Sequence, residues 1–296
     1  MLGESLALAS ALTWALSVIL FKSSEAASPT AINLFKNTAA LSLLTITMLV
    51  TGTEFAQDRP WADWGALALS GILGIAIADN LYLSALRRLG AGLLAVVECA
   101  YAPVIVLFSV VFLAEEVGWA FAIGATLVVA GIYFASSSGK SVVVLVKHLD
   151  PRQRRIGILS ALLGIVLMGF GVVLAKPILN DAAVLEVTCV RLLAGWGAQL
   201  GWVLLNPRAR PALGIILPSK VWRTLAPAAF LGSYLSMMLW LGGFKWTSVS
   251  TASVLNQMTV VFTLILARVF LGETLSHRRT VGAALALTGA LVVLVS

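Results

Sequence analysis

The sequence predicts an all-α membrane protein with ten transmembrane helices, arranged as two inverted repeats of five helices. Its composition is the first observation: 60% of the residues are hydrophobic and 11% are charged, whereas an ordinary soluble domain carries about 25% charged residues. The second is its length. A bilayer core about 30 Å thick needs roughly 20 apolar residues per span, so 296 residues allow about ten spans. The third is an internal repeat with a constant offset of 158 residues.

The apolar runs and the breaks between them define the elements in chain order. Each run is predicted to be a helix, because hydrocarbon offers no partner for unpaired backbone groups. Runs such as 118–134 also lack the alternating polarity of a membrane-barrel strand. The first run follows Met1 and Glu4 without the basic region of a signal peptide, so it is predicted to remain as a span. The predicted spans are 3–21, 31–51, 64–86, 91–113, 119–138, 156–176, 185–205, 222–243, 249–271 and 279–296.

The basic segment 139–155, near the middle of the chain, divides the protein into two halves. We predict a first five-helix repeat in residues 1–139, a connecting loop in 140–155 and a second five-helix repeat in 156–296. Because five is an odd number of spans, the second repeat enters the membrane from the opposite side, as in many carriers. The offset of 158 carries Leu73-Gly74, Arg87, Leu113-Ala114-Glu115-Glu116, Gly124 and Gly131 onto Leu231-Gly232, Lys245, Leu271-Gly272-Glu273-Thr274, Gly282 and Gly289.

With these elements, the sequence resembles the EamA-type members of the drug/metabolite transporter superfamily over nearly the whole chain. The residues that carry the resemblance are Ala85 to Gly92, Tyr101-Ala102-Pro103, Leu113-Ala114-Glu115 and Phe270-Leu271-Gly272-Glu273. The resemblance implies ten spans in two five-span repeats. It also implies secondary transport, often export of amino acids or other small metabolites, from a central cavity between the halves.

Lysine and arginine are distributed unequally between the two sides of the predicted membrane. One side holds only Arg59, Lys176 and Lys245. Because Lys and Arg are retained in the cytoplasm, we expect both termini to lie outside a bacterial cytoplasmic (inner) membrane. The family resemblance implies the opposite orientation. The basic side carries Lys22, Arg87, Arg88, Lys140, Lys147, Arg152, Arg154, Arg155, Arg208, Arg210, Lys220, Arg223, Arg278 and Arg279.

Four ionisable residues within predicted spans are candidates for substrate binding or ion coupling: Lys36, Asp79, Glu98 and Arg191. Such groups are costly in hydrocarbon and usually face a cavity or one another. The two carboxylates would bind a substrate ammonium group or exchange protons, and the alternative is a structural pair of Lys36 with either acid. Arg191, which aligns with Lys36, would attract a carboxylate or phosphate. Its alternative is a pair with Glu186.

Polar and aromatic residues within the spans extend this candidate site. Amides in hydrocarbon either bond between helices or line a wet path, which adds Asn80, Asn256 and Gln257. Aromatic rings with a polar tip suit amphipathic ligands, although packing or lipid-facing positions are the alternative. Pro103 can kink its helix and act as a hinge. The aromatic candidates are Trp14, Tyr82, Tyr101, Tyr234 and Trp240.

These features favour a transporter over the alternatives. A Walker A loop is absent, so any coupling would come from protons, exchange or a substrate gradient. The main alternative is a flippase for a lipid-linked or amphipathic substrate, and an intramembrane hydrolase is the alternative from another class. No cofactor or metal is predicted, because Cys99 and Cys189 lie inside apolar runs. Expected partners are the lipid bilayer and a small-molecule substrate but not nucleic acid, with the chain a monomer or homodimer.

Overall fold

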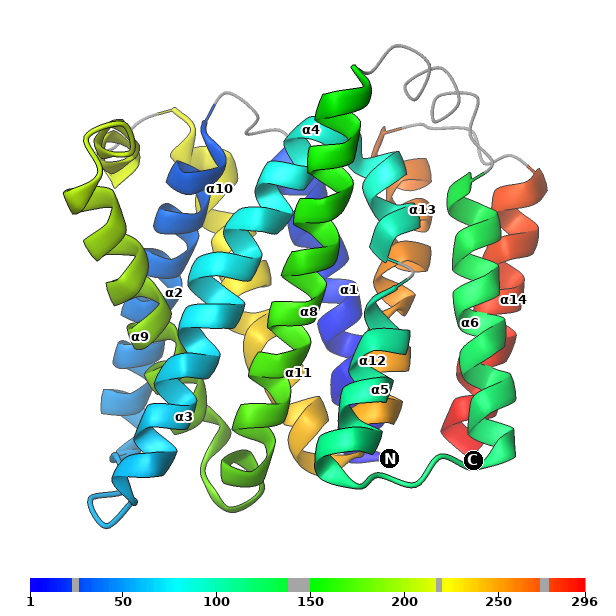
Figure 1. Cartoon of the computed structure of the whole chain (residues 1–296), viewed down its shortest axis with the longest axis horizontal. Coiled ribbons are helices and arrows are strands. Elements are labelled where there is room, and N and C mark those ends of the chain that lie inside the picture. Colours follow the sequence, from blue (N-terminus) through cyan, green and yellow to red (C-terminus); the bar gives the residue numbers. More distant parts are fainter. Residues whose placement is uncertain (23–26, 99, 138–149, 217–219, 272–276, 296) are drawn as a thin grey trace.

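The computed structural model describes residues 1–22, 27–98, 100–137, 150–216, 220–271 and 277–295 (Figure 1). Within these ranges every regular element is helical, so the all-α prediction is confirmed. Most of the predicted connecting loop, with Lys140, Lys147 and His148, lies outside the described residues. So do Cys99, Gly272-Glu273-Thr274 and the side chains of Lys22 and Arg279.

The described part of the first half forms six α-helices and one π-helix. The π-helix η1 joins α3 to α4 without interruption, and Figure 1 shows the chain turning over within α4 at the top of the bundle before it runs back down to Glu98. The predicted break at 87–90 therefore lies inside the helical range of α4 rather than between two helices. The elements are α1 (Leu2–Lys22), α2 (Pro29–Thr51), α3 (Trp61–Gly71), η1 (Ile72–Ala78), α4 (Asp79–Glu98), α5 (Tyr101–Leu113) and α6 (Trp119–Ser137).

The second half repeats this order with one longer first helix. A second π-helix, η3, joins α10 to α11. The elements are α8 (Pro151–Asp181), α9 (Val184–Leu205), the 3-10 helix η2 (Arg210–Ile216), α10 (Trp222–Ala229), η3 (Phe230–Leu235), α11 (Ser236–Trp246), α12 (Val249–Asn256), α13 (Met258–Leu271) and α14 (His277–Val295).

Six described helices are long and apolar enough to cross a membrane: Leu2–Phe21, Pro29–Thr51, Trp61–Leu89, Pro151–Asp181, Val184–Leu205 and Trp222–Trp246. Shorter apolar helices accompany them at Tyr101–Leu113, Trp119–Phe134 and Val281–Val295. The chain is therefore an integral membrane protein by length and composition, and the ten-span, inverted arrangement stays a prediction.

The irregular features of the two halves fall at the same register. The π-helices begin at Ile72 and Phe230, and the helices α6 and α14 begin at Trp119 and His277. Each pair is 158 residues apart, which is the offset of the sequence repeat. The helix that ends at Glu98 and the helix that ends at Asn256 are also 158 residues apart. A π-turn widens a helix and is frequent at functional sites.

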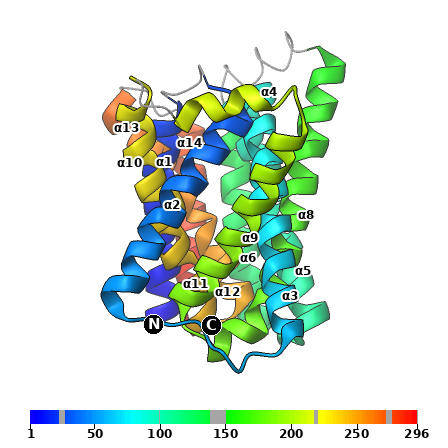
Figure 2. The ribbon, with the colours of Figure 1, turned by 90° about the vertical axis from the view of Figure 1, so that its left-hand side faces the viewer.

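Both termini lie at one end of the helix bundle, at the bottom of Figures 1 and 2. We call this the terminal end. We call the opposite end, where α8 and α10 begin and α9 ends, the basic end. The largest cluster of buried apolar residues joins both halves. It includes Ala7, Ala11 and Ile105 of the first half and Phe244 and Val249 of the second.

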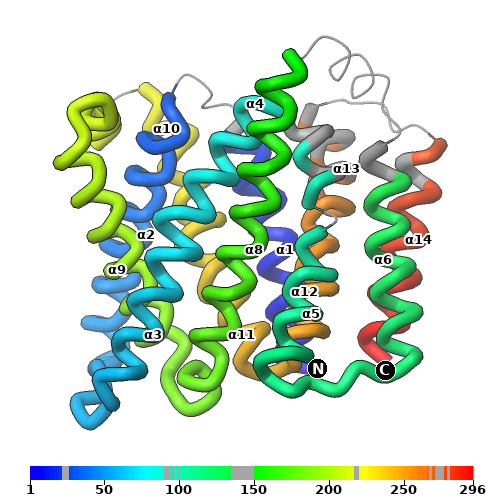
Figure 3. The backbone as a smooth tube through the Cα atoms, in the orientation of Figure 1, coloured from blue at the N-terminus to red at the C-terminus, as the bar shows by residue number. Residues whose placement is uncertain are grey.

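Helices α6 and α14 form a separate pair at one edge of the bundle (Figure 3). They pack along their length through glycine. A Cβ atom on Gly289 would lie 2.6 Å from the Gly124 carbonyl oxygen, so only glycine permits this approach. The pair therefore stands outside the group of helices that encloses the central cavity.

Candidate functional site

A cavity of about 170 Å³ lies between the two halves of the chain. Elements α1, α2, η1, α4 and α5 of the first half contribute to its wall, and so do α8, η3, α11, α12 and α13 of the second half. Most of the residues that the sequence predicted for the site line this cavity: Trp14, Lys36, Asp79, Tyr82, Glu98, Tyr101, Trp240, Asn256 and Gln257.

Lys36 and Asp79 form a buried ion pair at the edge of the cavity. The Lys36 Nζ atom lies 2.6 Å from Asp79 Oδ2 and donates a second hydrogen bond to Asn37 Oδ1 at 3.1 Å. Asp79 is the first residue after η1, so the π-helix sets the direction of its side chain. Of the two structural pairings considered for Lys36, the structure forms the one with Asp79.

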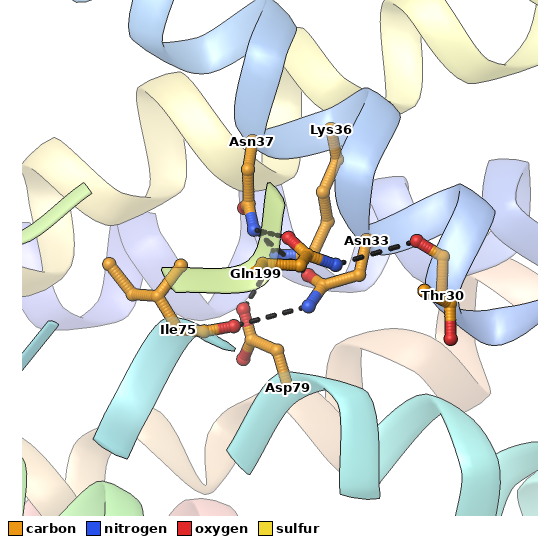
Figure 4. A network of polar contacts seen from close by, with 7 residues as sticks. All are labelled: Thr30, Asn33, Lys36, Asn37, Ile75, Asp79 and Gln199. Carbon is orange, nitrogen blue, oxygen red and sulfur yellow. Dashed lines mark hydrogen bonds and ion pairs between the residues drawn. The ribbon is translucent and has the colours of Figure 1, made fainter. Parts of the chain in front are cut away.

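A network of amides holds this ion pair in place (Figure 4). Asn37 Nδ2 donates to Gln199 Oε1 of α9 at 3.1 Å and to Asn33 Oδ1 at 3.2 Å. Asn33 Nδ2 donates to the Ile75 carbonyl in η1 at 3.1 Å, and Gln199 Nε2 donates to the Thr30 carbonyl at 3.4 Å. The network joins α2, η1 and α9, and it fixes the α2 face that carries Lys36.

Two interrupted helices meet at the middle of the cavity wall. Helix α4 ends at Glu98 and helix α12 ends at Asn256, and the Gln257 side chain donates to the Glu98 carbonyl oxygen at 2.8 Å. Interrupted helices of this kind place free backbone groups and side chains at midplane binding sites in carriers. The Nδ2 atom of Asn256 is buried and has no hydrogen-bond partner.

The Glu98 carboxylate faces the cavity beside the Tyr82 hydroxyl. None of the ion pairs among the described residues involves Glu98. The Trp14 ring lies 6.3 Å from the Tyr82 ring, measured between centroids. Glu98 therefore presents a carboxyl group without a counter-charge to the cavity, whereas the charge of Asp79 is balanced by Lys36.

Arg191 is buried in the layer behind the cavity wall, with 2% of its surface exposed. Its Nε and Nη1 atoms have no hydrogen-bond partner. The guanidinium carbon lies 5.7 Å from the centre of the Trp240 ring, and Trp240 Nε1 donates to the Tyr101 hydroxyl at 3.1 Å. Trp240 and Tyr101 line the cavity but Arg191 does not, so a ligand reaches Arg191 only after the wall moves.

The proposed alternative pairing of Arg191 with Glu186 is wrong. Glu186 accepts from Arg59 Nη2 at 2.8 Å and from the Ala56 amide at 3.0 Å, so it joins α9 to the connection between α2 and α3. The Arg59 guanidinium also lies over the Trp64 ring at 5.3 Å. Glu186 lies in the first turn of α9, within reach of Arg59 in the connection between α2 and α3.

Three further predicted site residues lie away from the cavity. Asn80 Oδ1 accepts from Thr30 Oγ1 at 3.4 Å, and the Tyr234 hydroxyl bonds with Thr47 Oγ1 at 2.7 Å. Pro103 is exposed on the outer face in the first turn of α5. The interruption at Gln257 matches the one before α5 although the second half has Val261 in place of a proline, so proline is not required for the break.

Sequence reasoning missed the small polar residues of the wall. Ser10 Oγ lies 3.1 Å from Ser236 Oγ, and Ser233 has a buried hydroxyl without a partner. A single serine in an apolar run is often bonded to its own helix backbone, so it does not by itself indicate a cavity. Only the positions of these serines in the repeat, relative to Asp79 and Glu98, would have done so. The wall residues that were not predicted include Ser10, Gly164, Met168, Gly232, Ser233, Ser236, Met237 and Thr259.

The cavity therefore combines one carboxylate in an ion pair, one carboxylate outside any described ion pair, two polar groups without a hydrogen-bond partner and four aromatic rings. Within the described ranges no three His, Cys, Asp or Glu side chains gather closely enough to hold a metal ion. A small molecule with both a positive and a polar or negative group would satisfy these atoms.

Comparisons with known proteins agree with this architecture. A model of the EamA-like transporter family matches residues 1–137 and 155–295. An uncharacterized transporter of Clostridium kluyveri is 24% identical over 230 residues, which cover 78% of this chain and 72% of the relative. A solved structure titled "Crystal structure of protein" has a TM-score of 0.79 and 21% identity, and covers 98% of this chain and 95% of its own. That likeness shows the fold alone.

Proposed function

This chain belongs to the EamA-like transporter family, and from that membership and the central cavity we propose that it is a secondary transporter that exports small metabolites such as amino acids. A membrane transporter, rather than an enzyme, is supported by the family and by the transporter relative. The proposed substrate class and direction of transport rest on the cavity and on the groups that line it.

The single observation that carries the proposal is the Glu98 carboxylate, which faces a cavity between the halves without an ion-pair partner. A substrate ammonium group would neutralise it there. The buried, unpaired Asn256 Nδ2 and Ser233 Oγ atoms would bond to the polar remainder of the substrate. Tyr82 and Trp240 would pack against its apolar part.

The size of the cavity favours a small metabolite over a lipid-linked substrate. Its volume is about 170 Å³, below the roughly 300–1,000 Å³ of sites for drug-sized ligands. A flippase would need a wider site with an apolar exit for its lipid tail. Arg191 would attract the substrate carboxylate once the Trp240 ring moves aside, because its Nε and Nη1 atoms have no partner.

Transport would proceed by alternating access between the two halves. The repeated π-helices and helix interruptions at an offset of 158 residues support two related halves around one site. Protons are the proposed coupling ion, with Glu98 and Asp79 as the exchanging groups. The unequal distribution of Lys and Arg supports a bacterial inner membrane with both termini outside.

The test is counterflow in proteoliposomes loaded with defined pools of amino acids, with a fluorescent-lipid scrambling assay run in parallel. We expect uptake of at least one zwitterionic amino acid, and Glu98→Gln should reduce it at least tenfold while the protein still inserts. Glu116→Gln is the matched control, because Glu116 is exposed at the terminal end. Lipid scrambling without amino acid counterflow would replace this proposal with a flippase, and equal transport by both variants would remove Glu98 from the site.

A further inference from the structure

The terminal end of the molecule carries an unusual contact between the two interrupted helices. Glu115 follows α5 of the first half, and its carboxylate meets the first residues of α12 of the second half. Oε1 accepts from the Val249 amide at 2.6 Å. Oε2 accepts from the Ser250 amide at 2.9 Å and from the Ser250 hydroxyl at 2.6 Å. Both oxygens of one side chain are therefore engaged across the interface between halves.

The backbone is specially shaped to make this contact. Ala114 has φ 52° and ψ 35°, and it is the one non-glycine residue with positive φ in the described ranges. Alanine rarely adopts this left-handed conformation, and strained residues of this kind cluster at switch regions. The strained turn ends α5 and directs Glu115 towards α12. A carboxylate at a helix N-terminus is favourable, because it binds free amide groups and the positive end of the helix dipole.

Other contacts between the halves strengthen the same end. The Ser109 hydroxyl of α5 lies 2.7 Å from the Ser250 hydroxyl of α12. Glu186 bonds to Arg59 at 2.8 Å, and Glu4 Oε1 accepts from Thr247 Oγ1 at 3.0 Å. In the last two contacts, as in that of Glu115, a glutamate binds a residue of the other half, so acidic side chains join the halves at this end.

The basic end is joined differently in the part of the chain that the structure describes. No carboxylate there joins the two halves. Arg88 Nη1 instead donates a hydrogen bond to the neutral amide oxygen of Gln153. A small extension of the cavity runs from Asp79 towards this end between Val18, Phe21 and Leu86. In the described residues, carboxylate hydrogen bonds therefore join the halves at the terminal end, whereas apolar packing, such as Phe35 against Trp222, joins them at the basic end.

We propose that Glu115 is the latch of the terminal-end gate: its bonds to α12 hold the cavity closed on that side, and their loss opens it. This inference rests on the proposed transport by alternating access. Helices α5 and α12 are the terminal-end segments of the two interrupted helices, which cross at Glu98 and Gln257. Their separation opens a path from the cavity without moving the basic-end segments, α4 and α13.

Accessibility of a cavity cysteine tests the latch without knowledge of the substrate. Cys99 and Cys189 are first replaced by serine, and Ser236, which lines the cavity, becomes the reporter as Ser236→Cys. A membrane-impermeant maleimide is applied to the terminal end. Glu115→Gln should raise the labelling rate at least tenfold, because the amide sets an N–H donor against the backbone donors of α12. Glu116→Gln, the exposed neighbour, should label as the parent does.

A milder variant guards against a folding defect in Glu115→Gln. Ser250→Ala removes one of the three hydrogen bonds of Glu115, together with the hydroxyl contact to Ser109. It should raise terminal-end labelling about fivefold, which corresponds to about 1 kcal/mol. Unchanged terminal-end labelling in both variants, when both are monodisperse and melt as the parent does, would overturn the latch.

Cross-linking gives an independent measurement of the closed state. The Ser109→Cys, Ser250→Cys pair should form a disulfide on mild oxidation, because the two hydroxyl oxygens are adjacent. In that background Glu115→Gln should slow disulfide formation at least fivefold, and Glu116→Gln should not. Equal rates in all three proteins would contradict the latch. If the latch responds but no amino acid is transported, the gate stands and the proposed substrate class fails.

Discussion

Two buried cations occupy aligned positions in the two halves but have different surroundings. Lys36 of α2 and Arg191 of α9 are each 2% exposed. Lys36 is fully engaged, by Asp79 at 2.6 Å and by Asn37 at 3.1 Å. Arg191 has two nitrogen atoms without a hydrogen-bond partner, and its guanidinium carbon lies 5.7 Å from the centre of the Trp240 ring.

The difference indicates two roles for a buried charge. A charge in a low-dielectric interior is costly unless it is paired, and a paired charge is in turn strongly destabilised when its partner is removed. Lys36 is therefore committed to holding α2 against α4. Arg191 has N–H donors without acceptors, as expected of a residue that binds an anionic ligand. Substitutions at the Lys36–Asp79 pair should therefore lower stability, whereas substitutions at Arg191 should lower transport.

The largest effect is expected from Asp79→Asn, on stability. It leaves the Lys36 charge buried without a counter-charge, and we expect a loss of about 3 kcal/mol in the free energy of unfolding. The value is at the lower end of the range for buried pairs, because the Asp79 side chain is 13% exposed, at the cavity. Unfolding by SDS in mixed micelles measures it, and insertion should be preserved.

The double variant Lys36→Met, Asp79→Leu is the control for this prediction. Removing both charges removes the unpaired cation, so most of the lost stability should return. A double variant as unstable as Asp79→Asn would show that the amide network, rather than the charge balance, stabilises this region.

Arg191→Gln should show the opposite pattern, with transport reduced and stability kept. Because the Nε and Nη1 atoms bond to nothing in the described structure, their removal costs the resting protein no hydrogen bond there. If they bind a substrate carboxylate, the loss of a charged contact worth about 2 kcal/mol reduces counterflow about 30-fold. Melting of the detergent-solubilised protein should be unchanged or higher.

Arg191→Lys sharpens the same point. Lysine keeps the charge but not the forked donors, so transport should recover only in part if the guanidinium binds a carboxylate. Full recovery would mean that Arg191 acts only as a positive charge near Asp79. A lower melting temperature in Arg191→Gln would make Arg191 a structural residue like Lys36.

The sequence predicted the helical fold because that depends on apolar run length, and the cost of buried charge gave the Lys36–Asp79 pair as one of two structural alternatives. The cavity between the halves was expected from the family resemblance. It did not predict the positions of Asn80 and Tyr234. Both follow or lie within a π-helix, whose extra residue rotates the helix face relative to regular periodicity. The Arg59–Glu186 pair was also missed, because the path of a connection cannot be derived from helix periodicity.

Gln199→Leu tests the support of Lys36 with a smaller expected effect. Gln199 accepts from Asn37 and donates to the Thr30 carbonyl, so its loss removes two interhelical hydrogen bonds between α9 and α2. Such bonds contribute little each in membranes, and we expect about 1 kcal/mol less stability. Transport at saturating substrate should fall less than twofold. A large transport defect with normal stability would place Gln199 in the coupling pathway instead.

The smallest effect is expected on the Arg191 side, from Trp240→Phe. Phenylalanine keeps an aromatic face over the guanidinium but loses the Nε1 hydrogen bond to the Tyr101 hydroxyl. The weaker cation–π contact and the lost bond together correspond to about 0.5 kcal/mol, or roughly a twofold change in substrate KM. If Trp240 only shields Arg191, the looser ring lets substrate reach the guanidinium more easily and KM falls. If the ring also packs against the substrate, KM rises. The direction of the KM change in counterflow therefore decides whether Trp240 only covers Arg191 or binds the substrate together with it.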